Sequence, residues 1–94
     1  MAGAPPHKGP VSAEIWAYRA IPQAFSKAKA ALAEYGQIVP DTKPDCDNIS
    51  KAYLDSLSGI VIVDDAQVVD LIVHKRWAPT ARTVITLQTF SCDF

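Results

Sequence analysis

The 94-residue sequence has few cysteines, scattered glycines, no long apolar run and no excess of charge of either sign. Nine Lys and Arg are matched by ten Asp and Glu, so the global charge does not indicate a nucleic-acid partner. Apolar runs such as residues 59–63 are far shorter than the roughly 18 to 20 residues of a membrane span. The N-terminus lacks the apolar core of a secretory signal. We therefore expect a small, single-domain cytoplasmic protein without a membrane partner.

The N-terminal end of the sequence differs in composition from the rest. Residues 1–10 contain three of the seven prolines and two of the four glycines, which favours an irregular lead-in before a domain that covers residues 11–94. Within that domain, apolar and more polar residues alternate over residues 11–19 and predict a strand. Trp16 and Tyr18 fall on its more polar face, and we expect them to pack under a helix or in a dimer interface.

Two helices are predicted after this strand. Helix formers over residues 23–36 end at a glycine, as a helix C-terminus favours. After a loop with two prolines, Asp47 or Asn48 can cap a second helix that runs to about Leu57 and is closed by Gly59.

The second half of the sequence is rich in β-branched residues. Residues 60–63 could form a short buried strand, and residues 68–76 and 83–90 predict two further strands, joined as a hairpin with a longer turn. The predicted fold is a small two-layer α+β domain with a mixed or antiparallel sheet, two helices and the order β-α-α-β-β, with one optional extra short strand.

Carboxylates surround the second predicted helix. On a helical wheel Asp47, Lys51 and Asp55 share one face, while Asp45 precedes the helix and residues 64–65 add an Asp-Asp pair after the next apolar run. A simple interpretation is a solvated helix face with an N-cap, stabilised by an Asp47–Lys51 pair, and a turn at the Asp-Asp pair.

The alternative interpretation is a cation site. If the chain returns so that Asp65 lies beside the N-terminus of the helix, three carboxylates converge, and they repel one another unless a cation shares them. Carboxylate oxygens suit Mg²⁺ or Mn²⁺. Lys51 could then neutralise charge on a phosphoryl oxygen, and the implied chemistry is metal-assisted phosphodiester hydrolysis.

Other nucleotide or metal motifs are incomplete. A calcium loop starting at Asp45 has Ile49, Ser50 and Ser56 at positions that need a ligand, a glycine and a glutamate. A nuclease motif built on Pro-Asp and a later acid-x-Lys fails because Val73 stands where the acid is required. The scattered glycines form no phosphate-binding loop.

The two cysteines also complete no motif. Cys46 and Cys92, with His7 and His74, lack the paired spacing of a zinc site. Without an export signal two cysteines are a poor disulfide framework, so we expect both thiols to be reduced.

The segment PDCDNISKAYLDSLSGIVIVDDAQVVDLIVHKR resembles the core of the RusA-type Holliday junction resolvases. Their hallmark is Asp-x-Asp-Asn, a lysine three residues after the Asn, a further Asp, and a closing Asp-Asp-x-Gln-Val, and every hallmark position is filled here. The resemblance is sharp over residues 43–76 and looser over the first strand, the following helix and the last strand.

The resemblance implies a Mg²⁺-dependent, homodimeric endodeoxyribonuclease, encoded by a bacterium or phage, that binds four-way junction DNA and nicks two strands symmetrically in recombination and repair. Mn²⁺ would substitute for Mg²⁺. It implies that three residues bind the metal and that a lysine completes the catalytic set, with three supporting residues. The metal ligands are Asp45, Asp47 and Asp65, the lysine is Lys51, and the supporting residues are Asn48, Asp64 and Gln67.

The sequence also departs from this family in two respects. Full-length relatives carry a further strand and helix before the point where this chain begins, so we expect a truncated form or an internally assigned start. Junction-binding proteins usually expose a basic surface, and here Lys43, Lys75 and Arg76 are the residues we predict to contact DNA, with a solvated surface as the alternative for each. Trp77 could stack on an exposed base, although covering the core is the favoured alternative.

Two functions from other classes remain open at this point. One is a truncated, non-catalytic DNA-binding or interaction module of the same family. The other is a metal-stabilised structural dimer with no role on DNA.

Overall fold

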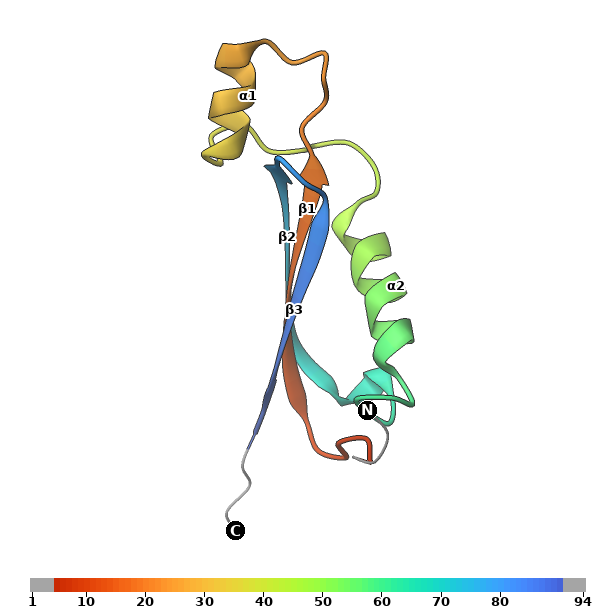
Figure 1. The fold of residues 1–94 in the computed structure, drawn as a ribbon. Coiled ribbons are helices and arrows are strands. Elements are labelled where there is room, and N and C mark those ends of the chain that lie inside the picture. Colours follow the sequence, from red (N-terminus) through yellow and green to blue (C-terminus); the bar gives the residue numbers. More distant parts are fainter. Residues whose placement is uncertain (1–4, 91–94) are drawn as a thin grey trace.

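A computed structural model describes residues 5–90 and shows a three-stranded sheet with two helices (Figure 1). The order of the elements confirms the predicted β-α-α-β-β arrangement and the small α+β class. In chain order the elements are β1 (Val11–Ala20), α1 (Lys27–Glu34), α2 (Cys46–Leu57), the 3₁₀ turn η1 (Asp65–Gln67), β2 (Val68–Ala78) and β3 (Arg82–Thr89). No helix in this part of the chain is long and apolar enough to cross a membrane.

The sheet is mixed, with the strand order β2-β1-β3. The strand β1 pairs in parallel with β2 and antiparallel with β3, so it lies between the two strands that follow one another in the sequence. The predicted hairpin of residues 68–76 and 83–90 is therefore wrong. Alternation indicates that each strand exists but not which strand it pairs with. The strand β1 has two edges with backbone groups free to pair, and it takes β2 on one edge and β3 on the other.

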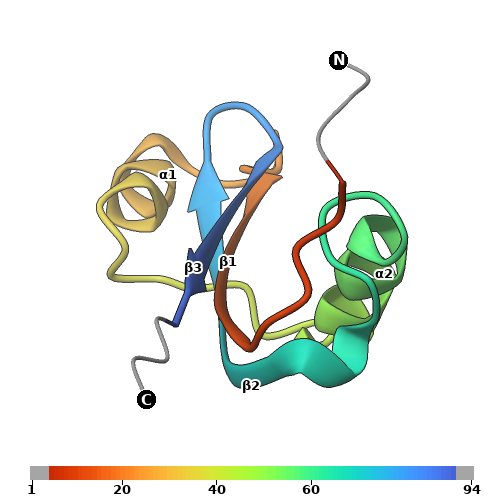
Figure 2. The same ribbon diagram turned by 90° about the horizontal axis from the view of Figure 1, so that it is seen from below.

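The core lies between one face of the sheet and α2. Along β1, Val11, Ala13, Ile15 and Ala17 are buried, and every second residue between them is only half-buried. Ile15 and Ala17 form the centre of the core with Ile49 of α2, and Tyr53, Val73 and Ile85 pack against them. Figure 2 shows α2 beside one face of the sheet, with α1 on the opposite side. The amphipathic face of α2 is thus what closes this small core.

Trp16 and Tyr18 alternate with these buried residues and so point to the other face of the sheet. The helix α2 therefore does not cover this pair, since it packs on the opposite face. Their expected position under a helix or in a dimer interface stays a prediction.

Both helices begin at a side-chain cap. The Ser26 hydroxyl accepts a hydrogen bond from the Lys29 amide at 3.1 Å at the start of α1. The cap of α2 is Asp45, so the prediction of Asp47 or Asn48 as the cap is wrong by two or three residues. The physical reason is that a cap needs an extended backbone, and Asp45 has φ −78° and ψ 167° while Asp47 and Asn48 are already helical. Gly59 follows the helix with φ 84°, as predicted for its closing residue.

The apolar run at residues 60–63 is a turn, so the predicted extra strand is wrong. The amides of Val61 and Ile62 donate to the Leu57 carbonyl, and the Gly59 amide donates to the Ile62 carbonyl at 2.7 Å. Ile62 is completely buried and forms isolated bridges with His7 of the lead-in and with Ser58, while the neighbouring Ile60 is 70% exposed. The bonds that close the end of α2 leave too few amides for a strand ladder.

Candidate functional site at the two ends of α2

The N-terminal end of α2 carries three of the four predicted catalytic residues. The carboxylate of Asp45 accepts a hydrogen bond from the Asn48 amide at 2.9 Å, which caps the helix. Asp47 lies in the first turn, where the positive end of the helix dipole favours an acid, and Lys51 follows one turn later. All of these side chains, and Asn48, are exposed. This end of α2 therefore presents two carboxylates and an ammonium group to solvent.

Two cations from the sheet hold the loop that leads into this end. Arg19 Nη1 of β1 donates to the Lys43 carbonyl at 2.5 Å, and Lys75 Nζ of β2 donates to the Thr42 carbonyl at 2.6 Å. Both bonds are charge-assisted and join segments far apart in the sequence. They fix the position of Asp45 relative to the strands, so Lys75, which we predicted to contact DNA, has a structural partner in the chain itself.

The C-terminal end of α2 faces the Asp64–Asp65 turn. The neighbouring Asp64 carboxyl, through a hydrogen bond and its negative charge, raises the pKa of Asp65, and the charge of Asp55 raises it further. Asp55 belongs to the last turns of α2, and Figure 1 shows η1, which begins at Asp65, beside that end of the helix. This end gathers three carboxylates that disfavour one another's ionised forms.

Gln67 holds this turn in place through both the oxygen and the nitrogen of its side-chain amide. Its Oε1 accepts hydrogen bonds from the amides of Val63 at 2.7 Å and Asp64 at 2.8 Å. Its Nε2 donates to the carbonyls of His7 at 2.8 Å and Gly9 at 2.7 Å. One side chain thus ties the acidic turn to the lead-in, which gives a physical reason for a glutamine two residues after the Asp-Asp pair.

The two acidic ends lie apart within one chain. The ten residues from Asp45 to Asp55 span about 15 Å along the helix axis. Within residues 5–90, no group of three or more His, Cys, Asp and Glu side chains is arranged to hold a metal ion. The expectation that the chain returns Asp65 to the N-terminal end of α2 is therefore wrong, and the three predicted ligands do not fit a metal site within a single chain. Their roles as ligands stay a prediction.

The expected helix-face ion pair is also wrong. Asp47 and Lys51 do not lie within 4.0 Å of each other. In the part of the chain that the structure describes, the pair of charged groups at that distance is His74 Nε2 and Glu14 Oε2, which are 2.8 Å apart. Lys51 is therefore not neutralised by Asp47 or Asp55 at ion-pair distance, and its ammonium group is available to a ligand.

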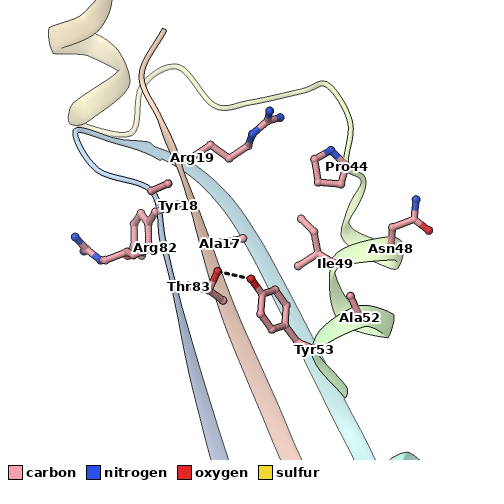
Figure 3. Close-up of a pocket in the computed structure, with 11 residues that line it drawn as sticks. Ala17, Tyr18, Arg19, Pro44, Asn48, Ile49, Ala52, Tyr53, Arg82 and Thr83 are labelled. Atoms are coloured by element: carbon pink, nitrogen blue, oxygen red, sulfur yellow. Dashed lines mark hydrogen bonds between the residues drawn. The ribbon is translucent and has the colours of Figure 1, made fainter. Parts of the chain in front are cut away.

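A cavity of about 640 Å³ lies beside the N-terminal half of α2 (Figure 3). Its floor includes Ile49 and Tyr53, whose hydroxyl makes a 2.8 Å hydrogen bond with Thr83 Oγ1. Asn48 lies at its rim, and Arg19 and Arg82 also line it. The cavity therefore combines an apolar wall with the Arg19 side chain next to the predicted catalytic segment, while the Arg82 side chain points away from Ile49 and Tyr53 (Figure 3).

The sequence reasoning missed both arginines of this cavity. Neither lies in the acidic motif, and no spacing rule connects β1 and β3 with α2. Arg19 was detectable only as a charged residue at the end of an alternating strand, and Arg82 only as the first residue after a turn.

The remaining predicted DNA contacts lie on different surfaces. Lys43 is exposed in the loop before α2, and Arg76 lies over the Trp16 ring, 5.4 Å from its centroid. Trp77 is half-buried and meets Phe25 edge-on at 5.5 Å between ring centroids, with Arg19 over its ring. That environment agrees with the favoured core-covering interpretation of Trp77. Cys46 is an exposed free thiol, and Cys92 lies outside the described residues.

Comparison with known proteins supplies the family. The sequence profile of the family described as endodeoxyribonuclease RusA matches residues 1–88. Over 85 residues the chain is 40% identical to "Uncharacterized protein YqaN" of Bacillus subtilis (strain 168), an alignment that covers 88% of this chain and 60% of that protein. The chain thus spans less than two thirds of the length of this relative, and no solved structure gives a significant match. A profile match over nearly the whole chain shows that the chain belongs to the RusA endodeoxyribonuclease family.

Proposed function

We propose that this chain is a structure-selective endodeoxyribonuclease that resolves four-way DNA junctions as a homodimer with Mg²⁺ or Mn²⁺, in recombination and repair. The single observation that carries the proposal is the family match over residues 1–88, which includes every residue of the acidic motif. The exposure of Asp45, Asp47 and Lys51 on one end of α2 supports it, because a phosphodiester must reach these groups from solvent.

The proposed roles follow from charge and position. Lys51, without an acid at ion-pair distance, would stabilise negative charge that develops on a phosphoryl oxygen. Asp45 caps α2 by accepting a hydrogen bond from the Asn48 amide at one carboxylate oxygen, which leaves its second oxygen for a metal ion. Gln67 positions the Asp64–Asp65 turn and does not itself contact substrate.

The separation of the acids supports the homodimer part of the proposal. A three-carboxylate set needs Asp45, Asp47 and Asp65, and one chain holds them at opposite ends of α2. Two α2 helices that run antiparallel bring opposite ends together, and a two-fold axis then creates two equivalent sites. Two equivalent sites suit a substrate that is cut at two related strands.

A junction-cleavage assay tests the proposed activity. The protein is incubated with a synthetic four-way junction whose strands are labelled one at a time, in Mg²⁺, Mn²⁺, Ca²⁺ or EDTA. We expect paired nicks with Mg²⁺ and Mn²⁺, none with EDTA, and loss of about 100-fold or more in rate for Lys51→Ala. Lys27→Ala on exposed α1 is the matched control and should cut as the natural sequence does.

The separation of the acids in one chain also favours a second candidate, the non-catalytic DNA-binding module. That module would bind the junction with no nicks in any metal and with the same affinity for the Lys51→Ala protein. A folded protein that shows this result contradicts the endonuclease proposal, and a protein that ignores the junction contradicts both.

A further inference from the structure

The face of the sheet away from α2 carries a cluster of aromatic and basic side chains. We call it the aromatic–basic patch, and it consists of Trp16, Tyr18, His74, Arg76 and Arg82. The Trp16 and His74 rings stack with centroids 3.7 Å apart and planes 12° apart, and Trp16 and Tyr18 are stacked at 6.2 Å. Arg82 lies over the Tyr18 ring at 4.3 Å. The patch thus consists of three nearly parallel rings with guanidinium groups beside them.

The register of the sheet explains why these residues meet. His74 and Val84 are the partners of Trp16 on β2 and β3, and Arg76 and Arg82 are the partners of Tyr18. Partners across a sheet point to the same face, so three strands contribute to one surface. In Figure 3 Tyr18 and Arg82 lie to one side of β1, away from Ile49 and Tyr53.

We propose that this patch binds an unpaired strand of nucleic acid, with bases stacked on Trp16 and Tyr18 and phosphates bound by Arg76 and Arg82. The inference deepens the proposed function, on which it rests for its ligand, because an opened junction offers unpaired nucleotides. Trp16 and Tyr18 are half-buried, and Arg82 beside them is exposed. Aromatic rings beside guanidinium groups have the chemistry that single strands need, since every base has a face to stack and every nucleotide a phosphate.

The charges of the patch support a phosphate-bearing ligand. In the described part of the chain, the acid at ion-pair distance from a residue of the patch is Glu14, which is bound by His74 at 2.8 Å. Within residues 5–90 neither Arg76 nor Arg82 has a carboxylate within 4.0 Å, so the two guanidinium groups are not neutralised by the described chain. A phosphodiester strand supplies the missing negative charge.

The same charges argue against a second copy of the chain as the occupant. A two-fold interface sets the same surface on both sides, so each of the two copies would bring Arg76 and Arg82 into it, and the interface would hold four guanidinium groups. Like charges in that position repel one another. An unpaired strand instead brings negative charge together with flat apolar rings.

Fluorescence anisotropy with a labelled fifteen-nucleotide oligo(dT) tests the inference, in EDTA so that cleavage does not interfere. We expect tighter binding of the single strand than of a duplex of the same length. Trp16→Ala should weaken binding about tenfold or more, while Trp16→Phe should recover part of the affinity because it keeps a ring. Arg82→Ala, at an exposed position, should weaken binding and reduce the slope of log affinity against log salt by about 0.7.

Two matched variants control for nonspecific loss of an aromatic ring or a charge. Tyr35→Ala removes a ring that is 80% exposed next to α1, and Lys27→Ala removes an exposed charge on α1. Both should bind within about twofold of the unmodified protein. Thermal unfolding of each variant checks that the fold is retained, and Arg82→Ala keeps the test decisive if Trp16→Ala fails to fold.

Equal binding by the unmodified protein, Trp16→Phe and Arg82→Ala would overturn the inference, as would equal affinity for single strand and duplex. Sedimentation that shows Arg82→Ala dissociating a dimer, with no change in oligo(dT) binding, would assign the patch to a second copy instead. Lys51→Ala separates this inference from the proposed activity, because it should lose cleavage and keep oligo(dT) binding. A protein that binds oligo(dT) through the patch but never cuts contradicts the proposed activity alone.

Discussion

The two ends of α2 both carry acids, but they are held by different means. At the N-terminal end the helix itself orders Asp45, and charge-assisted bonds from Arg19 and Lys75 fix the preceding loop. At the C-terminal end the acids sit on a short turn that one neutral amide, Gln67, ties to the lead-in. The first end offers a carboxylate pair with a free lysine, and the second concentrates negative charge. Acids that lie close together in the sequence therefore belong to two surfaces, with Asp45 and Asp47 on one and Asp64 and Asp65 on the other.

The largest expected effect is the loss of junction cleavage when an acid of the proposed metal-binding set is replaced. Replacement of an acid outside the set is the control. Asp47→Asn and Asp65→Asn each keep the shape of the side chain, and each should lower junction cleavage by about 100-fold or more. Asp55→Asn changes an acid of the same helix that lies outside the set, and cleavage should stay within about twofold. Initial rates of nicking provide the measurement. Equal losses in all three variants would contradict a division of roles among these acids.

Gln67 is the next test, because its removal should destabilise the Asp64–Asp65 turn at the C-terminal end of α2 and leave the N-terminal end of that helix unchanged. Gln67→Ala removes four hydrogen bonds and takes their side-chain partner from the Asp64 amide and the Gly9 carbonyl, whereas the Val63 amide and the His7 carbonyl still bond to each other at 3.3 Å. We expect a loss of about 2 kcal/mol in the free energy of unfolding. Urea denaturation measures this loss. Gln88→Ala, on an exposed position of β3, is the matched control and should change stability by less than about 0.5 kcal/mol. A Gln67→Ala protein as stable as this control would mean that the four hydrogen bonds do not hold the turn.

At the other end, two substitutions of Asp45 separate capping from chemistry. Asp45→Ala removes the cap and should lower stability by about 1 kcal/mol. Asp45→Asn caps equally well, so its thermal unfolding should match that of the natural sequence while junction cleavage is lost. If Asp45→Asn retains full cleavage, Asp45 is a helix cap and no more.

The smallest expected effect is a change in how stability depends on pH, and it arises from the two carboxyls of the Asp64–Asp65 turn. Because Asp64 raises the pKa of Asp65 above its ordinary value of 3.8, the folded protein holds a proton more tightly than the unfolded chain. The contribution of Asp65 to stability is therefore complete below that value and is lost as the pH rises through the higher folded pKa. Asp64→Asn should reduce this loss, seen as a flatter dependence of the melting temperature on pH between about 3.5 and 7. An unchanged dependence would show that the two carboxyls do not interact.

Local sequence patterns predicted the elements of this fold but not their pairing. Alternation over residues 11–19 and helix formers before Gly36 are local signals, and both elements formed as expected. The insertion of β1 between β2 and β3 depends on contacts between segments more than fifty residues apart, which no periodicity encodes. Residues 60–63 have strand-forming side chains, yet three of their amides donate hydrogen bonds to the Leu57 carbonyl at the end of α2 and are not available to a neighbouring strand.

The sequence singled out candidate residues for the site but not their geometry. The acidic motif and its resemblance to the family pointed to Asp45, Asp47 and Lys51, the family match covers the same segment, and the roles of these residues stay a prediction. The separation of Asp65 from Asp45 by the length of α2 follows from where the chain turns after the helix, which the sequence pattern leaves open. Arg19 and Arg82 entered only when the strands were placed beside α2.

Mixing two inactive proteins tests most directly whether acids from opposite ends of α2 act in one site. Asp47→Asn chains are exchanged with Asp65→Asn chains, and junction cleavage by the mixture is compared with that of each variant alone. If two chains build each site, a mixed dimer contains one site with Asp47 and Asp65 both intact, so cleavage returns at one strand. A mixture as inactive as its components would contradict this account.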